Sequence, residues 1–331
     1  MTANTPDSPT GRRRSRLDRI PVIKDLRRSR GLQRGMLIAG TAITALLLLT
    51  ALLAPLVAPY SWAQTSLNGV SFNTQEAPSA QHIWGTTVSG FDVFSRVIWG
   101  TRTAVSVIVA AVVASIFVGV LLGLVSGYLG GWLDRILVMI ADAVYAFPSL
   151  LLAIVMSIVI SGGQSSKWGG IWAAALSITV VFVPQYFRVI RAEAIRLKAE
   201  PFVEAAKAMG APHRRVMFTH LLRNSTRTLP LIMTLNASEA ILTLAGLGFL
   251  GFGIEPTAAA EWGYDLNRSI ADVTSGIWWT AIFPGVAIVV SVLGITLMGE
   301  SMNDLNDPRL RTRRRGRSRT ASPAQPQEVS A

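Results

Sequence analysis

Long runs without charge alternate along the chain with short segments that carry most of the charged residues. Five of these runs contain no Asp, Glu, Lys or Arg and cover residues 36–75, 103–133, 143–166, 168–187 and 273–299. Each can supply the roughly 20 apolar residues with which a helix crosses a bilayer. A sixth run, 228–254, is interrupted only by Glu239. The pattern predicts six transmembrane helices and an all-α, polytopic membrane protein.

The same runs divide the chain into segments. We expect a basic cytoplasmic tail at 1–35, a first transmembrane helix at 36–58, an extracytoplasmic loop at 59–102, a core of five helices at 103–300 with a cytoplasmic loop at 188–228, and a cytoplasmic, mostly disordered tail at 301–331. The first run exceeds the ~7–15 residues of a signal-peptide core, which predicts an uncleaved anchor. Residues 12–34 form either an interfacial helix or a solvated tail, and 311–331 lack the apolar residues needed for a core.

Composition and charge support a membrane protein. Apolar residues make up 50% of the 331 residues and charged residues 15%, whereas about a quarter of the residues in a soluble domain are charged. The net charge of +12 does not indicate a nucleic-acid partner, because the basic residues are segregated instead of being interleaved with aromatic residues. They cluster in 1–35, 127–135, 188–228 and 300–331. By the positive-inside rule, both termini face the cytoplasm.

The longest predicted cytoplasmic loop contains an amphipathic segment that is too short to span a membrane. Its apolar residues recur at i, i+3, i+4 and i+7, and they are Phe202, Ala205, Ala206 and Met209. We expect this face to pack on protein. Gly210 suits a left-handed helix cap and Pro212 the first turn of a following helix, so the loop is predicted to be helix, turn, helix. Its outer face carries Lys207, Arg214 and Arg215.

Several short motifs follow one another in a recognisable order. The first set is Glu204-Ala205-Ala206, then Gly210 and Leu229-Pro230. The other stretches are Gly130 to Arg135, Asp142 with Ala146-Phe147-Pro148, His220-Leu221-Leu222 with Asn224, GLGFLGFGIEP from Gly246, Glu261-Trp262-Gly263, and Asp307 to Leu310. Over about residues 80–312, the chain resembles the C-type permease subunits of binding-protein-dependent ABC importers of the dipeptide, oligopeptide and nickel group.

The resemblance implies a type I importer permease with six transmembrane helices in the cytoplasmic membrane, without enzymatic activity or a cofactor of its own. It implies a second permease subunit in a heterodimer, two cytoplasmic ABC ATPase domains that bind the ATP, and an extracytoplasmic substrate-binding protein. The loop with Glu204-Ala205-Ala206, the EAA loop of such permeases, would dock in a cleft of an ATPase subunit and move the membrane helices. The residues assigned to this coupling are Glu204, Ala205, Ala206, Met209, Gly210, Arg214, Arg215 and His220. Arg214 and Arg215 are equally explained as ordinary positive-inside charge.

Two stretches depart from the family pattern. Thr87 and Phe91 stand where related permeases carry an acid and an arginine, so we expect no ion pair at those positions. Arg223 replaces a proline in the coupling loop. Because proline breaks helical hydrogen bonding, the arginine predicts a straighter second helix in this loop.

Two acids in or near the predicted spans are candidates for the translocation path. Asp142 lies near the cytoplasmic start of the third span, where pairing with Arg135 or with a neighbouring helix favours a structural role. Glu239 lies roughly 16 Å into the fifth span. Ionisable residues at such depth tend to face a bundle interior or a water-filled path, so a role in the path and packing against a polar neighbour both explain it.

Motifs for other chemistry are missing or weak. The chain has no G-x-x-x-x-G-K-[ST] motif for phosphate and no cysteine for a disulfide or a thiolate metal site. The glycines between 246 and 253 predict close helix packing. His82, His213 and His220 fall on two sides of the membrane, so we expect no shared metal site. His220 is expected to pack or hydrogen-bond within the coupling loop.

Within the group that the chain resembles, di- or oligopeptides are the expected cargo. Nickel complexes, haem or another small solute fit the same architecture, because the binding protein selects the cargo. A secondary transporter would show paired internal repeats or several charges within the membrane. A membrane-embedded enzyme would show a cluster of His, Asp or Glu in its spans. The sequence shows neither pattern.

Overall fold

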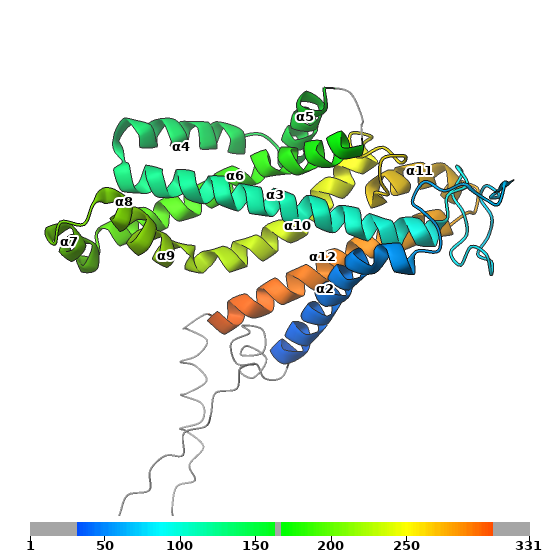
Figure 1. The fold of residues 1–331 in the computed structure, drawn as a ribbon, viewed down its shortest axis with the longest axis horizontal. Helices are drawn as coiled ribbons and strands as arrows, with labels where there is room; N and C mark the ends of the chain where they lie inside the picture. Colours follow the sequence, from blue (N-terminus) through cyan, green and yellow to red (C-terminus); the bar gives the residue numbers. More distant parts are fainter. Residues whose placement is uncertain (1–31, 163–166, 307–331) are drawn as a thin grey trace, which may run out of the picture.

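The long helices of this protein form an elongated bundle (Figure 1). The structure is a computed structural model that describes residues 32–162 and 167–306. Of the two predicted tails, residues 32–35 and 301–306 belong to helices, and the rest lies outside the described residues. Within the described residues, five helices are long and apolar enough to cross a membrane. They are α2 (Leu32–Val57), α3 (Val93–Leu129), α6 (Lys167–Lys198), α10 (Leu229–Phe249) and α12 (Trp279–Asn306). The predicted helical membrane fold is confirmed.

The third span was predicted as one continuous helix, but the chain forms two helices there, joined by a bend. α4 (Gly131–Tyr145) and α5 (Ser149–Ser161) together have the length and composition of a sixth span, but they meet at an angle of 100°. Pro148 cannot donate a hydrogen bond to α4 and disfavours the helical conformation of Phe147, so α4 ends there. In Figure 1, α4 runs along the bundle and α5 stands away from its axis. We call the bend at residues 146–148 the elbow.

Other helices also extend beyond the charge-free runs. α3 starts at Val93, within the loop predicted at 59–102, because the carboxylate of Asp92 accepts a hydrogen bond from the Ser95 N–H at 2.7 Å and caps the helix. α6 likewise continues to Lys198. Charged residues at a helix end that lies outside the hydrocarbon do not interrupt the helix, so runs without charge locate the spans but not their ends.

A row of glycines brings α3 and α6 into backbone contact. Gly119, Gly123 and Gly127 follow one another at intervals of four residues, so they lie on one side of α3. A Cβ on Gly123 would stand 2.6 Å from the carbonyl oxygen of Phe187 in α6, and one on Gly127 would stand 2.7 Å from that of Arg191. Small residues at such an interface allow the close approach by which membrane helices associate. α3 and α6 therefore form the most tightly joined pair of the bundle.

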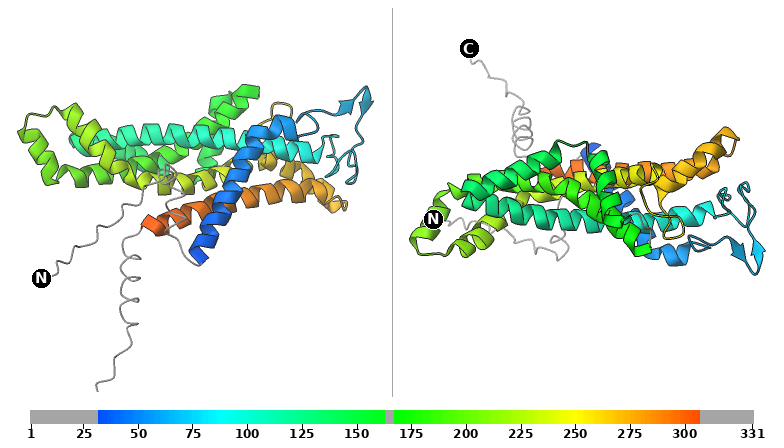
Figure 2. Two further views of the ribbon diagram at one scale, coloured as in Figure 1. Left: turned by 60° about the horizontal axis from the view of Figure 1, so that its bottom comes forward. Right: turned by 90° about the horizontal axis from the view of Figure 1, so that it is seen from above.

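Short elements gather at the two opposite ends of the bundle (Figure 2). One end carries the predicted coupling loop, with α7 (Pro201–Ala208), α8 (His213–Arg215), a π-helical turn (Val216–Leu221), α9 (Leu222–Ser225) and a 3-10 turn (Thr226–Thr228). The other end carries the antiparallel hairpin of β1 (Ser66–Leu67) and β2 (Val70–Ser71), and helix α11 (Trp262–Thr274). Neither the hairpin nor α11 follows from the charge-free runs.

Buried polar contacts hold the hairpin end together. Arg96 of α3 forms an ion pair with Asp265 of α11, and its Nε donates to Asp265 Oδ1 at 2.8 Å. Arg96 Nη1 donates to the carbonyl of Trp62 at 2.9 Å. Hydrogen bonds of this kind offset part of the cost of burying a charge pair. These contacts therefore join the loop after α2 to α3 and α11.

Thr87 and Phe91, the two residues that depart from the family pattern near the start of α3, make contacts with other residues of this segment. The Thr87 hydroxyl accepts a hydrogen bond from the Phe91 N–H at 3.1 Å. The guanidinium of Arg96 lies 4.8 Å from the centre of the Phe91 ring. Phe91 thus gives Arg96 a cation–π contact in addition to its ion pair with Asp265.

Candidate functional site

The first helix of the coupling loop, α7, buries only part of its apolar surface against the rest of the chain. Val203 and Ala206 are 0% and 4% exposed, whereas Met209 is 82% exposed, and Phe202 and Ala205 are also exposed. Of the four residues of the predicted apolar face, only Ala206 packs on this chain. Because α7 has only 8 residues, two positions one turn apart suffice to hold it on the bundle. The remaining apolar side chains are left for a partner.

The turn after α7 has the predicted left-handed glycine. Gly210 has φ = 78°. Its N–H donates to the carbonyl of Lys207 at 2.9 Å, and the Ala211 N–H donates to that of Ala206 at 3.0 Å. These two bonds define a Schellman motif, which satisfies carbonyls at the end of a helix. No atom lies within 4 Å of where a Cβ on Gly210 would stand, so only the backbone conformation requires glycine here.

The second half of the loop is helical without a break, but it is not a regular α-helix. The path from His213 to Thr228 includes a π-helical turn and a 3-10 turn. The remaining side chains assigned to coupling are Glu204, Arg214 and Arg215, which are exposed, and His220, which is half-buried in the π-helical turn. Among the described residues, no ion pair involves Glu204, Arg214 or Arg215. The backbone carbonyl of His220 accepts a hydrogen bond from Asn224 at 2.9 Å.

Tyr128 of α3 anchors the coupling loop. Its hydroxyl lies 2.6 Å from His213 Nδ1, and its carbonyl accepts a hydrogen bond from Lys198 at 2.7 Å. The ammonium groups of Lys198 and Lys207 each lie 5.7 Å from the centre of its ring. Tyr128 also belongs to a buried apolar cluster with Val203 of α7 and with residues of the π-helical turn. The loop is thus joined to α3 as well as to α6, from which the chain enters it.

A polar network attaches α4 to the same pair of helices. Asp134 accepts hydrogen bonds from Arg191 Nε and Nη2 of α6 at 2.6 and 2.7 Å. It also accepts one from the Ser126 hydroxyl of α3 at 2.5 Å. A bidentate arginine–carboxylate pair fixes both distance and orientation. The first half of the broken span is therefore fixed on α3 and α6.

Glu239 lines a cavity of about 230 Å³ at the elbow. It is the eleventh of the 21 residues of α10, and its side chain is exposed on the surface of the chain. The other residues that line the cavity are Val144, Tyr145, Phe147, Ser149 and Leu152 around the elbow, and Val181, Phe182 and Gln185 of α6. A carboxylate, an amide and three aromatic rings in one cavity can receive a cationic polar group beside an apolar one.

Asp142, the other candidate acid, pairs with a neighbouring helix instead of with Arg135. Its Oδ1 lies 2.7 Å from Nη2 of Arg188 in α6. The guanidinium of Arg188 lies 4.4 Å from the centre of the Tyr145 ring. Both members of the pair are about half exposed, at 44% for the Arg188 side chain and 58% for that of Asp142. An exposed pair of this kind contributes little stability, on the order of 0–1 kcal/mol. It joins α4 to α6, and residues of both helices also line the Glu239 cavity.

The loop between α10 and α11 shows the predicted close packing of glycines. The carboxylate of Glu261 caps α11 by accepting hydrogen bonds from the N–H groups of Gly263 and Tyr264 at 2.8 and 2.7 Å. Gly248 of α10 lies against it, where a Cβ would overlap Glu261 Oε2. Burial raises the pKa of Glu261 to about 8, although the two backbone N–H groups partly offset this rise.

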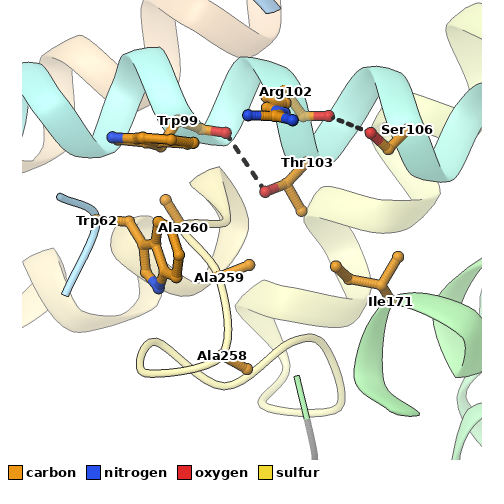
Figure 3. A pocket seen from close by; sticks show the side chains of 9 residues that line it. All are labelled: Trp62, Trp99, Arg102, Thr103, Ser106, Ile171, Ala258, Ala259 and Ala260. Carbon is orange, nitrogen blue, oxygen red and sulfur yellow. Dashed lines mark hydrogen bonds between the residues drawn. The ribbon is translucent and has the colours of Figure 1, made fainter. Parts of the chain in front are cut away.

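A second cavity, of about 310 Å³, opens near the hairpin end of α3 (Figure 3). Two tryptophan rings form one wall, and they meet edge to face with 5.1 Å between the ring centres of Trp62 and Trp99. Arg102 lies beside them, with its guanidinium 5.6 Å from the centre of the Trp99 ring. The other lining residues are Thr103, Ser106, Ile171, Ala258, Ala259 and Ala260.

Sequence reasoning missed several of these residues. Tyr128 lies two residues before the Gly130–Arg135 motif and carries no signal of its own, because its role depends on the loop folding back onto α3. Arg102 could have been found as the cation that directly precedes the charge-free run at 103–133. Two tryptophans near the same boundary strengthen that signal, because tryptophan is enriched at membrane interfaces.

With this arrangement described, comparison with known proteins identifies the family. Residues 119–312 match the family model described as "Binding-protein-dependent transport system inner membrane component". The chain belongs to this family and is a permease of a binding-protein-dependent ABC importer. It is thus a multi-pass protein of the inner membrane and not an enzyme. The family carries no cofactor, since partner ATPases bind the ATP.

Individual relatives resemble the chain over most of its length. The dipeptide transport system permease protein DppC of Alkalihalophilus pseudofirmus is 36% identical over 275 residues, which cover 83% of this chain and 86% of the relative. The glutathione transport system permease protein GsiD of Salmonella typhimurium is 34% identical over 279 residues, covering 84% and 88%. GsiD of Pectobacterium atrosepticum is 31% identical over 309 residues, covering 91% and 99%.

Proposed function

We propose that this chain forms half of the translocation pathway of an importer for di- or oligopeptides, opposite a second permease subunit. The observation that carries the proposal is Glu239, an exposed acid halfway along α10 that lines the cavity at the elbow. An intramembrane acid needs a partner or water to offset the cost of its charge. The ammonium group of a peptide would provide that partner, and Tyr145 and Phe147 would contact its side chains. The relatives named for dipeptide and glutathione transport support this cargo class.

The proposal assigns the coupling loop to a cytoplasmic ATPase subunit, and both chain termini to the cytoplasm. Glu204, Ala205, Met209, Arg214 and Arg215 are exposed at one end of the bundle. This exposed set combines apolar side chains with basic groups, which suits a cleft with acidic residues. Ala206, Gly210 and His220 then shape the loop from within. An extracytoplasmic binding protein would deliver cargo at the other end, where the hairpin and α11 lie.

Substitution of Glu239 tests the pathway. In proteoliposomes that hold the complete importer, Glu239→Gln is expected to reduce uptake of a dipeptide with a free amino terminus by roughly tenfold, because a hydrogen bond to a charged group contributes ~1.5–3 kcal/mol. Uptake of the N-acetylated dipeptide, measured with saturated binding protein, should change little. Glu255→Gln is the matched control, since Glu255 is an exposed acid outside the cavity.

A labelling experiment gives an independent measurement. The chain has no cysteine, so a Glu239→Cys variant carries a single thiol that water-soluble reagents reach only through an aqueous path. Labelling in at least one nucleotide state is expected. Unchanged uptake of both dipeptides together with an unreactive thiol in every state would refute the pathway role. Selective uptake of a nickel complex or haem in place of peptides would retain the permease and overturn the cargo.

A further inference from the structure

One side of α3 is exposed and changes from cationic to apolar along its length. The residues on this side are Arg102, Ser106, Val109, Val113 and Phe117, all exposed and separated by three or four positions. Such spacing aligns side chains on one side of a helix. The row extends over about 22 Å at 1.5 Å per residue, and it becomes fully apolar after Ser106. We call these five residues the α3 row.

Arg102 stands at the end of the α3 row without an acid to pair with. Among the described residues, no carboxylate lies within ion-pair distance of it, and its guanidinium donates no hydrogen bond. Its contact is the face of Trp99. Trp99 and Trp62 are held in place by their indole nitrogens, which donate to the carbonyls of Tyr60 and Thr257 at 3.1 and 3.2 Å. The guanidinium is therefore the free donor beside the 310 Å³ cavity of Figure 3.

The position of Arg102 along α3 indicates what kind of molecule faces its guanidinium. It directly precedes the charge-free run at 103–133, so it lies at or just outside the edge of the hydrocarbon. Tryptophan residues gather at this boundary in membrane proteins, at the level of the lipid headgroups. An anion at this depth, with an apolar chain continuing along the helix, has the shape of one phospholipid.

We propose that the α3 row and the adjoining cavity bind a phospholipid. Arg102 binds the phosphate diester, and the glycerol ester region lies beside Thr103 and Ser106. One acyl chain lies along Val109, Val113 and Phe117. A helix of the second permease subunit could cover the apolar part of the row. It would satisfy Arg102 only by placing an acid at the hydrocarbon boundary, which is costly. A phospholipid brings the anion and the apolar chain in one molecule. The proposal does not depend on the cargo.

Native mass spectrometry of the purified, delipidated importer complex tests the site, with dioleoyl phosphatidylglycerol as the probe. The wild type is expected to retain the lipid, and Arg102→Gln to weaken its binding by roughly tenfold, as expected for a lost hydrogen bond to a charged group. Arg102→Lys should retain part of the binding, which separates loss of charge from loss of fold. Arg268→Gln is the matched control, because Arg268 is an exposed arginine of α11 outside this cavity.

Competitors distinguish the possible occupants. Neither inorganic phosphate nor dioleoylglycerol should displace the probe, since each supplies only one half of the ligand. Displacement by inorganic phosphate would identify a free-anion site and overturn the proposal. Equal lipid binding by wild type and Arg102→Gln would also overturn it. So would release of the second permease subunit by Arg102→Gln without loss of lipid, because the row would then be a subunit interface.

Discussion

The hydroxyl of Tyr128, the penultimate residue of α3, lies 2.6 Å from Nδ1 of His213 in the coupling loop. The contact joins two segments separated by 85 positions in the sequence. Gly127, the residue before Tyr128, packs on the backbone of α6. A force applied to the loop therefore reaches both α3 and α6 at this point, in addition to its covalent path into α6 and α10.

Removing the Tyr128 hydroxyl should weaken coupling without unfolding the chain. Tyr128→Phe keeps the ring and its apolar contacts but loses the hydrogen bond to His213. We expect the cargo imported per ATP hydrolysed to fall by roughly threefold to tenfold, since a hydrogen bond contributes ~0.5–1.5 kcal/mol. Tyr60→Phe is the control, because it also removes a tyrosine hydrogen bond, which the Tyr60 hydroxyl donates to the carbonyl of Gln81 at 3.2 Å. An unchanged ratio in Tyr128→Phe would show that α3 takes no part in transmission.

The left-handed conformation of Gly210 makes a second prediction about the loop. Valine at this position costs roughly 1–2 kcal/mol for its backbone conformation, although there is open space for its side chain. Gly210→Val should therefore assemble normally, yet import less cargo per ATP. Asparagine tolerates a positive φ, so Gly210→Asn is expected to behave like the wild type. Equal impairment by both variants would point to a contact of the turn with a partner instead of to its backbone geometry.

Close packing of Gly248 against Glu261 predicts a sharp steric limit. A Cβ on Gly248 would overlap Glu261 Oε2 and stand 2.8 Å from the backbone nitrogen of Tyr264. Gly248→Ala should lower stability by roughly 1–3 kcal/mol, the usual cost of overpacking, as measured by thermal unfolding of the purified protein. Gly246→Ala is the matched control, because its Cβ would meet only the flexible end of Leu150. Similar melting temperatures for the two variants would contradict the packing described for α11.

Burial of Glu261 predicts a dependence of stability on pH. Its pKa is raised from 4.5 to about 8, chiefly by burial. Below about pH 4.5 the group is protonated in both folded and unfolded chains, so it causes no change of stability with pH there. Between about 4.5 and 8 the unfolded chain releases a proton that the folded chain keeps, so stability falls as pH rises and the loss is complete above pH 8.

The variant Glu261→Gln should remove this fall. It loses part of the α11 cap, at about 1 kcal/mol, so at pH 5 it should be slightly less stable than the wild type. The difference should shrink or reverse by pH 8, as measured by thermal unfolding across this range. Glu255→Gln, a neighbouring exposed acid, should retain the wild-type dependence. Parallel curves for the wild type and Glu261→Gln would exclude Glu261 as the titrating group.

Much of the fold follows from the sequence, because hydrocarbon excludes charge over the whole length of a span. The helix ends and the elbow do not follow from charge alone. Asp92 starts α3 ten residues before the charge-free run because it caps the helix. Pro148 divides the third span through its effect on the backbone, not on hydropathy. α11 was not predicted, because a helix outside the membrane that is rich in polar residues contains no long apolar run.

The coupling loop was predictable in outline and not in orientation. Gly210 predicted the turn after α7, because only a few residue types adopt a positive φ readily. The buried side of α7 could not be chosen from the sequence, since Val203 and Phe202 are both apolar neighbours in an 8-residue helix. The partner of Asp142 was left open between Arg135 and another helix for the same reason. Contacts such as Arg188–Asp142 span 46 positions and depend on tertiary packing.

The elbow between α4 and α5 also determines the dielectric surroundings of Glu239. Among the described residues, no donor bonds the carbonyls of Ala146 and Phe147, and both residues are exposed. Lipid hydrocarbon cannot solvate such groups, so at membrane depth they must face water or another protein chain. Glu239 shares its cavity with Phe147. If the proposed pathway is right, water at the elbow would interrupt the low-permittivity layer of the bilayer beside this carboxylate, and the electrostatic barrier to a charged solute would be lower there than along the lipid-facing helices.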